Sequence, residues 1–282
     1  MVRIISDSTC DLSKDLIEKY NIEIIPLHIH LGEDEFEDGR NIMPDDIYRW
    51  SDEHETTPKT AAVSMGEVLD VYGPILEAGD DIVCFSISDS MSTTGNVMRM
   101  AVDELEAEDR IFVINSANLS TGIGLLVIEA AKMAEEGKTA AEIAAQMEVL
   151  KPGVRASFVV DTLTYLHRGG RCSSVAALAG GVLKLHPKIV VEDGAMSAKK
   201  KYRGKMPMVI RSYVKDMEED LLKAKKDRVF ITHSGCEESL IEDVKAYLAS
   251  LNHFDEILVT RAGGVISSHC GPGTLGVLYL AE

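Results

Sequence analysis

The sequence predicts an α/β protein with two α/β domains. The first is expected to hold a mostly parallel sheet with helices on both faces, and the second a mixed sheet with helices. In the first half of the chain, short apolar segments alternate with segments of helical periodicity, which is typical of a parallel sheet. In the second half, the dipeptide Asp193-Gly194 lies between two strand-like segments and predicts an antiparallel hairpin. A length of 282 residues is enough for two such domains.

Local signals locate the elements of the first domain. Two helices begin with capping-box spacing, one at Ser64 with Glu67 and one at Thr139 with Glu142. The acidic stretch Glu33–Asp38 predicts an exposed turn. The predicted strands are Val2–Ser6, Ile22–Leu31, Ile82–Ile87 and Ile111–Ile114. The predicted helices are one ending near Tyr20, then Ser64–Ala78, Asn96–Leu105, Ile123–Glu136 and Thr139–Leu150.

A domain boundary is expected at the turn-forming segment Lys151–Gly153, which divides the chain into residues 1–150 and 151–282. The apolar, small-residue segment Val175–Leu183 predicts a helix that either packs closely or lines a hollow. The other predicted helices are Thr162–His167, Lys205–Lys223 and Glu237–Leu251. The predicted strands are Val154–Val160, Lys188–Glu192, Ala195–Ala198, Arg228–Thr232, Ile257–Thr260 and Gly276–Leu280.

The charge balance limits the classes of partner. There are 29 Lys and Arg residues against 46 Asp and Glu, for a net charge of −17. A field of this sign repels phosphate backbones and anionic lipid surfaces, so nucleic-acid or membrane binding is not expected as the main activity. No apolar run is long enough to span a bilayer, so an integral membrane protein is not expected either.

The N-terminus and the cysteines both indicate a cytoplasmic protein. The segment Met1–Asp7 begins a strand at once, so we expect no signal peptide. The five cysteines are widely spaced and include no Cys-x-x-Cys pair, so neither zinc nor a redox couple is indicated. Reduced thiols in the cytosol are the simplest interpretation.

Two hydroxyl-rich turns are candidates for holding an anion. The segment Ser88–Gly95 lies between a predicted strand and a predicted helix, where hydroxyls and free backbone amides can bind negative charge. Ser92 or Thr93 could equally serve as the helix cap. In the turn Thr56–Thr60, no capping role is evident for Thr60, which makes it a candidate ligand.

Three further segments could contribute charge. In Leu166–Arg171, two glycines allow the backbone to approach a ligand that an arginine could bind, although a helix C-cap has the same pattern. Lys199–Lys205 has five basic residues of seven, which fits either an edge strand or a docking surface. His269 precedes Gly271–Gly273, a turn that is expected to hold it on a constrained loop.

Signs of catalysis or metal binding are weak. His28 and His30 have i, i+2 spacing but no third ligand is evident, so we interpret them as the polar face of a strand. The sequence contains no Gly-x-Ser-x-Gly, no phosphate-binding loop and no His-Glu-x-x-His. Anion-holding groups without an activated nucleophile favour a binding protein.

Several of these segments, in order, resemble the DegV family. The opening Ser6–Asp11 is similar to the family's Asp-Ser-x-x-Asp, and Pro58–Glu67 to its Lys-Thr-Ser-Gln-Pro-Ser-Pro-Gly-Glu. The segment Ile87–Thr94 looks like its Ile-Ser-Ser-x-Leu-Ser-Gly-Thr. The remaining blocks match Gly169-Gly170-Arg171, Arg203-Gly204 and His269–Gly273. The order and separations of these blocks make the resemblance specific over the whole chain.

The resemblance implies that a long-chain, palmitate-like fatty acid is buried between two α/β domains, with no cofactor. It further implies that Thr60 and Ser92 hold the carboxylate and that His269 lies at the same end. Arg171 and Arg203 resemble the arginines that support phosphoryl transfer or docking of the partner. That partner is a separate ATP-dependent fatty acid kinase, which makes an acyl phosphate for phospholipid synthesis.

The sequence departs from the family pattern in the head-group loops. The departures are Ala61, Ala62, Val63, Met65 and Thr93. Three alternative functions remain open at this stage. The main one is a serine acyl hydrolase or acyltransferase that uses Ser92 and His269. The others are a phosphate-handling protein similar to dihydroxyacetone kinase and a regulatory module without a ligand.

Overall fold

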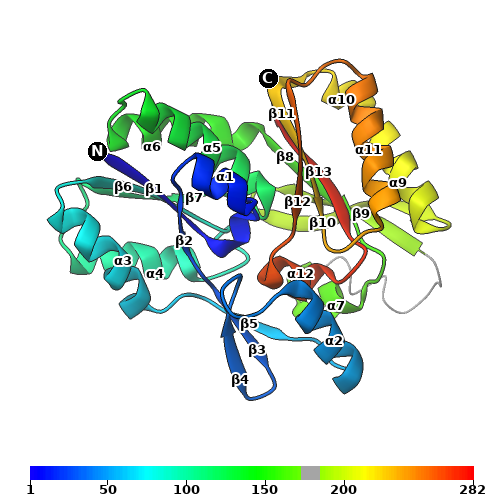
Figure 1. Ribbon diagram of the computed structural model, residues 1–282, viewed down its shortest axis with the longest axis horizontal. Helices are drawn as coiled ribbons and strands as arrows, with labels where there is room; N and C mark the ends of the chain where they lie inside the picture. Colours follow the sequence, from blue (N-terminus) through cyan, green and yellow to red (C-terminus); the bar gives the residue numbers. More distant parts are fainter. Residues whose placement is uncertain (173–184) are drawn as a thin grey trace.

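The computed structural model describes residues 1–172 and 185–282. It has the predicted two-domain α/β architecture, with a four-stranded parallel sheet in the first domain and a six-stranded mixed sheet in the second (Figure 1). The predicted helix Val175–Leu183 lies outside the described residues.

The four-stranded sheet has the order β2-β1-β6-β7, and every neighbouring pair is parallel. Its strands are β1 (Val2–Asp7), β2 (Glu23–Ile25), β6 (Asp81–Ser86) and β7 (Ile111–Asn115). Its helices are α1 (Lys14–Lys19), α3 (Met65–Glu77), α4 (Thr94–Glu104), α5 (Thr121–Glu135) and α6 (Ala140–Leu150). Helices α1, α5 and α6 cover one face and α3 and α4 the other, as predicted (Figure 1).

The helix starts follow the sequence signals. Ser64 accepts a hydrogen bond from the Glu67 amide while the Glu67 carboxylate accepts one from the Ser64 amide. Thr139 and Glu142 form the same reciprocal pair at the start of α6. Both capping boxes satisfy amide groups that the first turn of a helix leaves without partners.

The six-stranded sheet has the order β10-β9-β8-β13-β11-β12, with β11 and β12 its one parallel pair. Its strands are β8 (Val154–Val159), β9 (Leu185–Glu192), β10 (Ala195–Arg203), β11 (Ala224–His233), β12 (Glu256–Arg261) and β13 (Leu275–Ala281). Its helices include α9 (Met206–Lys215), α10 (Glu218–Leu221) and α11 (Glu238–Ser250). The predicted hairpin at Asp193-Gly194 joins β9 and β10.

A small antiparallel sheet, β4-β3-β5, projects from the first domain next to α2 (Figure 1). Its strands are β3 (His28–Leu31), β4 (Asp34–Glu37) and β5 (Lys59–Ala61), and α2 is Pro44–His54. The prediction of one strand over Ile22–Leu31 was wrong because the segment divides into β2 and β3, which belong to different sheets. The predicted exposed turn at Glu33–Asp38 was also wrong: it forms β4 and ends at a buried Asp38.

Two short elements border the region between the sheets. Helix α7 (Thr164–Gly169) ends at Gly170, whose left-handed conformation is the predicted C-cap. Helix α12 (Gly264–Cys270) contacts α2, α7, β3 and β5 (Figure 1). The largest apolar core joins α5 to residues of both large sheets, such as Phe85 and Phe230. Among the described residues, no helix is long and apolar enough to cross a bilayer.

Candidate functional site: a cavity with polar and apolar walls

A cavity of about 440 Å³ brings together four of the five predicted site residues. Its polar lining includes Thr60 from β5, Ser92 from the turn before α4, Arg171 from the segment after α7, and His269 from α12. Its apolar lining includes Leu27, Ile87, Met91, Leu119, Val265 and Ile266. The cavity therefore offers hydrogen-bond donors and hydrocarbon contact in one compartment, as sites for amphipathic small molecules do.

A small recess with a mainly apolar lining lies next to this site. The recess has a volume of about 30 Å³ and shares Leu119, Ile266 and Cys270 with the main cavity. Phe158 and Leu278 of the six-stranded sheet also line it. The three shared residues therefore border both cavities.

Thr60 and His269 are in direct contact although 209 positions separate them in the sequence. The Thr60 Oγ1 lies 2.8 Å from Nε2 of His269. Thr60 is fixed by backbone pairing, because β5 places it opposite Ile29 of β3. The small sheet therefore holds Thr60 against α12.

His269 lies on a helix, which corrects the expectation of a constrained loop. It belongs to α12, and the turn at Gly271 begins only after this helix ends. Burial, with a smaller effect from nearby Arg171, lowers the pKa of His269 from 6.5 to about 4. The imidazole is therefore neutral at pH 7, with one nitrogen that donates and one that accepts.

The second ring nitrogen of His269 faces the Gly169 backbone. Its Nδ1 is buried and has no hydrogen-bond partner among the described residues. A Cβ atom on Gly169 would lie only 2.4 Å from this nitrogen. The first glycine of the Gly169-Gly170-Arg171 segment is therefore required by the close approach of the imidazole.

Ser92 combines the two roles considered from the sequence. Its hydroxyl accepts a hydrogen bond from the Thr94 amide at 3.2 Å, at the first residue of α4, and also lines the cavity. Thr93, which occupies the cap position itself, makes no side-chain capping bond. Ser92 therefore caps the helix and is positioned by it.

The two predicted arginines occupy different places. Arg171 is exposed, donates to the Gly169 carbonyl at 2.7 Å and lines the cavity. Arg203 is the exposed last residue of β10, opposite Leu185 of β9, and is not among the described lining residues. The structure thus groups Arg171, but not Arg203, with the head-group candidates.

The basic segment Lys199–Lys205 lies mostly on β10, an edge strand of the six-stranded sheet. Lys199 forms an ion pair with Glu192 at 2.6 Å, and Lys200 forms one with Asp216 at 2.6 Å. Exposed lysines of this kind protect a sheet edge from pairing with another chain. This geometry agrees with the simpler of the two interpretations of the segment.

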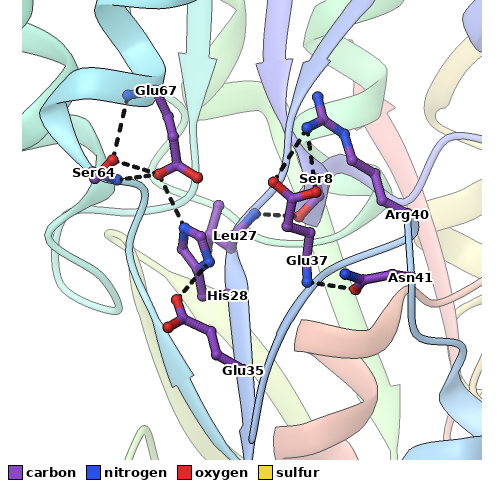
Figure 2. A network of polar contacts seen from close by, with 9 residues as sticks. All are labelled: Ser8, Leu27, His28, Glu35, Glu37, Arg40, Asn41, Ser64 and Glu67. Carbon is purple, nitrogen blue, oxygen red and sulfur yellow. Dashed lines mark hydrogen bonds and ion pairs between the residues drawn. The ribbon is translucent and has the colours of Figure 1, made fainter.

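His28 connects the small sheet to α3. Figure 2 shows its ring between Glu35 of β4 and Glu67 of α3, with nitrogen–oxygen distances of 2.9 and 3.0 Å. These contacts support β3 and therefore its neighbour β5, on which Thr60 lies. In the described part of the chain, no three His, Cys, Asp or Glu residues are grouped so as to hold a metal ion.

Three buried carboxyl groups beneath the site were not predicted as functional. Asp7, Asp11 and Asp38 are each at most 5% exposed. Burial raises the pKa of Asp7 to about 6, and it also raises the pKa values of Asp11 and Asp38. A signal was present for two of them, since Asp7 and Asp11 lie in the opening segment that resembles the DegV motif. Asp38 was missed because it was assigned to an exposed turn.

Comparison with known proteins agrees with this architecture. The model of the DegV family matches residues 1–282. A DegV domain-containing protein of Clostridium perfringens is 32% identical over 281 residues, which cover 100% of this chain and 99% of that protein.

Solved structures show the same fold. A DegV family protein from Thermus thermophilus, described as binding fatty acid, has a TM-score of 0.91 and 29% identity, with 100% of this chain and 99% of that chain covered. A stearic acid-binding protein from Eubacterium ventriosum has a TM-score of 0.86 and 27% identity, with 100% and 98% covered. The chain belongs to the DegV family.

Proposed function

We propose that this protein binds a long-chain fatty acid and presents its carboxyl group to a partner ATP-dependent fatty acid kinase for acyl-phosphate formation. The observation that carries the proposal is the cavity in which Thr60, Ser92 and His269 meet an apolar wall. The fatty-acid-binding descriptions of the Thermus and Eubacterium relatives support the same ligand class.

The hydrogen bonds of the site suit a carboxylate. In the tautomer that carries its proton on Nε2, neutral His269 donates to the Thr60 hydroxyl oxygen and leaves the Thr60 proton free for a carboxylate oxygen. The Ser92 hydroxyl donates to the other oxygen while it continues to accept from the Thr94 amide. Two hydroxyl donors fix the direction of the ligand, and its chain supplies most of the affinity.

The hydrocarbon chain supplies the driving force. A sixteen-carbon acid buries about 14 methylene groups, worth roughly 11 kcal/mol before the costs of association are subtracted. Ordering the chain and losing translational freedom remove several kcal/mol of this gain. The free energy that is left after these costs is enough for the ligand to stay bound during purification.

The geometry of His269 argues against the serine hydrolase alternative. A Ser-His pair of this kind requires a carboxylate on the far ring nitrogen to orient and stabilise the imidazolium. In the described structure, Nδ1 of His269 faces Gly169 instead. A pKa near 4 also makes the imidazole a weak base at pH 7.

Binding is tested by native mass spectrometry and titration. The purified protein should release a long-chain acid on denaturation, and the delipidated protein should bind added palmitate. Thr60→Val and Ser92→Ala should each weaken palmitate binding about tenfold, the effect of one charge-assisted hydrogen bond. Ser212→Ala, on an exposed position of α9, is the control and should bind normally. A protein that neither carries nor takes up a fatty acid contradicts the proposal, as does ester hydrolysis abolished by Ser92→Ala.

Presentation to the kinase needs a separate assay. With ATP and a fatty acid kinase, the loaded protein should yield acyl phosphate. Arg171→Ala and Arg203→Ala should each lower the rate of formation. Palmitate affinity should stay within about twofold of the wild type in Arg203→Ala, because Arg203 does not line the cavity. Normal rates in both variants would contradict their proposed roles in transfer or docking.

We propose residues 1–150 and 151–282 as the two domains, with the ligand between them. In the described structure, every strand of the four-stranded sheet precedes residue 150 and every strand of the six-stranded sheet follows residue 151. We also propose a cytoplasmic location, which is supported by the wide spacing of the five cysteines and by a sequence without a Cys-x-x-Cys pair.

A further inference from the structure

Three buried carboxyl groups connect the opening segment of the chain to the elements that carry Thr60, Ser92 and His269. They are Asp7, Asp11 and Asp38. Asp7 accepts a hydrogen bond from the backbone of the turn that leads to Ser92, and Asp11 and Asp38 accept hydrogen bonds from the backbone at the start of α12. None of the three lines the cavity. Any effect on the ligand is therefore exerted through the backbone that they hold.

Asp7 holds the turn that leads to Ser92. One carboxylate oxygen of Asp7 accepts from the Ile87 amide at 2.7 Å, directly after β6 ends. The other oxygen accepts from the amide and the hydroxyl of Thr9, at 2.9 and 2.5 Å. The Ile87 amide begins the turn Ser88–Thr93, so Asp7 sets where this turn leaves the sheet.

Asp38 and Ser8 hold the strand that positions Thr60. The Ser8 hydroxyl donates to Asp38 at 2.9 Å and accepts from the Leu27 amide at 3.1 Å, a contact that Figure 2 shows. Leu27 directly precedes β3, which pairs Ile29 with Thr60. A displacement of Leu27 would therefore move the strand against which Thr60 is registered.

Asp11 and Asp38 together hold the start of α12, the helix of His269. Asp11 accepts from the Gly263 amide at 2.8 Å, and Asp38 accepts from the Gly264 amide at 2.6 Å. Asp11 is itself held by the Ser120 hydroxyl at 2.5 Å. Two carboxyl groups from the first domain thus cap a helix whose sequence lies in the second.

The packing at this helix start is tight around its two glycines. A Cβ atom on Gly264 would lie 2.8 Å from the Asp38 carboxylate and 2.6 Å from the Ile29 side chain. A Cβ atom on Gly263 would lie 3.1 Å from Asp11. Glycine is therefore needed at position 264, and a side chain at position 263 would require Asp11 to shift by a few tenths of an ångström.

The stability of the fold does not account for these carboxyl groups. Removing a carboxylate from water is costly, and well-packed apolar residues often replace buried charges without loss of stability. At neutral pH the protein holds the Asp7 carboxyl in an environment that raises its pKa to about 6, so its ionisation there opposes folding. A role in positioning the binding-site residues would explain why the protein keeps these carboxyl groups despite the unfavourable free energy of burying them.

We infer that Asp7, Asp11 and Asp38 are positioning residues that align Ser92, Thr60 and His269 for the carboxyl end of the ligand. The inference rests on the proposed function, because it concerns the same site. It predicts that loss of a carboxyl group impairs recognition of the ligand's head more than that of its chain.

The test compares two ligands with the same chain. Delipidated full-length protein is titrated with radiolabelled palmitate and with radiolabelled hexadecanol, which lacks the charge. Asp7→Ala and Asp38→Ala should lower palmitate affinity at least about tenfold and leave hexadecanol affinity within about threefold. Asp38→Asn keeps one acceptor oxygen and should restore part of the palmitate affinity.

A matched control separates positioning from helix capping in general. The Asp46 carboxylate also accepts a hydrogen bond from a backbone amide at the start of a helix, in this case the Met43 amide before α2. Helix α2 carries no head-group residue. Asp46→Ala should therefore leave palmitate affinity within about twofold of the wild type. The ring resonances of His269 in NMR spectra should shift in Asp38→Asn and stay unchanged in Asp46→Ala.

The possible results distinguish a failure of the positioning role from a failure of the proposed function. Equal losses for both ligands, or wild-type preference for palmitate in the Asp7 and Asp38 variants, would overturn the positioning role alone. A wild-type protein that does not prefer palmitate over hexadecanol would overturn the proposed function. If the alanine variants do not fold, Asp7→Asn, Asp38→Asn and Ser8→Ala provide the same comparison.

Discussion

Asp7 should make the stability of this protein depend on pH in a sense opposite to that of most carboxyl groups. The side chain is completely buried, and this burial raises its pKa from 3.8 to about 6 despite hydrogen bonds from Thr9 and Ile87. The folded protein thus binds the Asp7 proton more tightly than the unfolded chain does. The resulting stabilisation is fully present below about pH 4 and is lost as the pH rises through about 6.

Replacement of Asp7 by asparagine isolates this effect. Asparagine has nearly the same shape and cannot ionise, so Asp7→Asn removes the titration. A pKa change from 3.8 to about 6 corresponds to about 3 kcal/mol. Between pH 4 and pH 7.5, the free energy of unfolding of the variant should rise by about 2.4 kcal/mol relative to the wild type, because the Asp7 carboxyl of the unfolded wild-type chain is already partly ionised at pH 4.

The assay is urea unfolding followed by circular dichroism at several pH values across this range. Burial lowers the pKa values of His233 and His269 to about 4, so their contributions are present above about pH 6.5 and are lost as the pH falls toward 4. Both proteins contain these histidines, so their contributions cancel in the difference.

Asp227→Asn, at an exposed position of β11, serves as the control for replacing a carboxyl group by an amide. The part of the difference in unfolding free energy between Asp7→Asn and the wild type that does not depend on pH reflects altered hydrogen bonds. Only the part that changes with pH reports the titration of Asp7. A difference that stays constant within about 1 kcal/mol from pH 4 to 7.5 would refute the reasoning.

Three further substitutions test the packing. Gly169→Ala should displace the His269 ring, because the new Cβ would lie 2.4 Å from Nδ1, and unchanged imidazole resonances would contradict this. Gly73→Ala, inside α3 with open space around it, should stabilise the protein by about 0.5–1 kcal/mol in thermal unfolding, and a lower stability would contradict it. Arg228→Met should cost about 3 kcal/mol because it leaves Glu129, 2.5 Å away, without its partner. Adding Glu129→Gln should recover much of that loss. A double variant that is no more stable than Arg228→Met would contradict the explanation that the loss comes from an unpaired Glu129 carboxylate.

Local chemistry explains what could be predicted about the fold. The capping box of Ser64 with Glu67 depends on residues within one helical turn, so its pattern is visible in the sequence. The hairpin at Asp193-Gly194 depends likewise on two residues that readily adopt a positive φ. Periodicity of apolar residues located the strands of both large sheets for the same reason, since it reflects which face of each element is buried.

Long-range packing explains what was missed. The segment Glu33–Asp38 looks like an exposed acidic turn, but pairing with β3 makes it a strand, and α12 buries its last carboxyl group. Similarly, His269 is helical because Asp11 and Asp38, more than 200 positions away, cap the start of its helix. The capping contacts join residues more than 200 positions apart, so the residues near His269 do not identify the carboxyl groups that hold its helix.

The sequence alone determined the element order, the two-domain α/β class and, through its resemblance to a family, the identity of Thr60, Ser92 and His269 as candidate ligands. Only the tertiary structure decided that Thr60 and His269 touch, that Arg203 lies away from the cavity, and that buried carboxyl groups hold the surrounding backbone. The physical reason is one of range. Caps and periodicity act within a few residues, whereas the site is assembled by side chains that meet only when the two sheets and the small sheet have packed together.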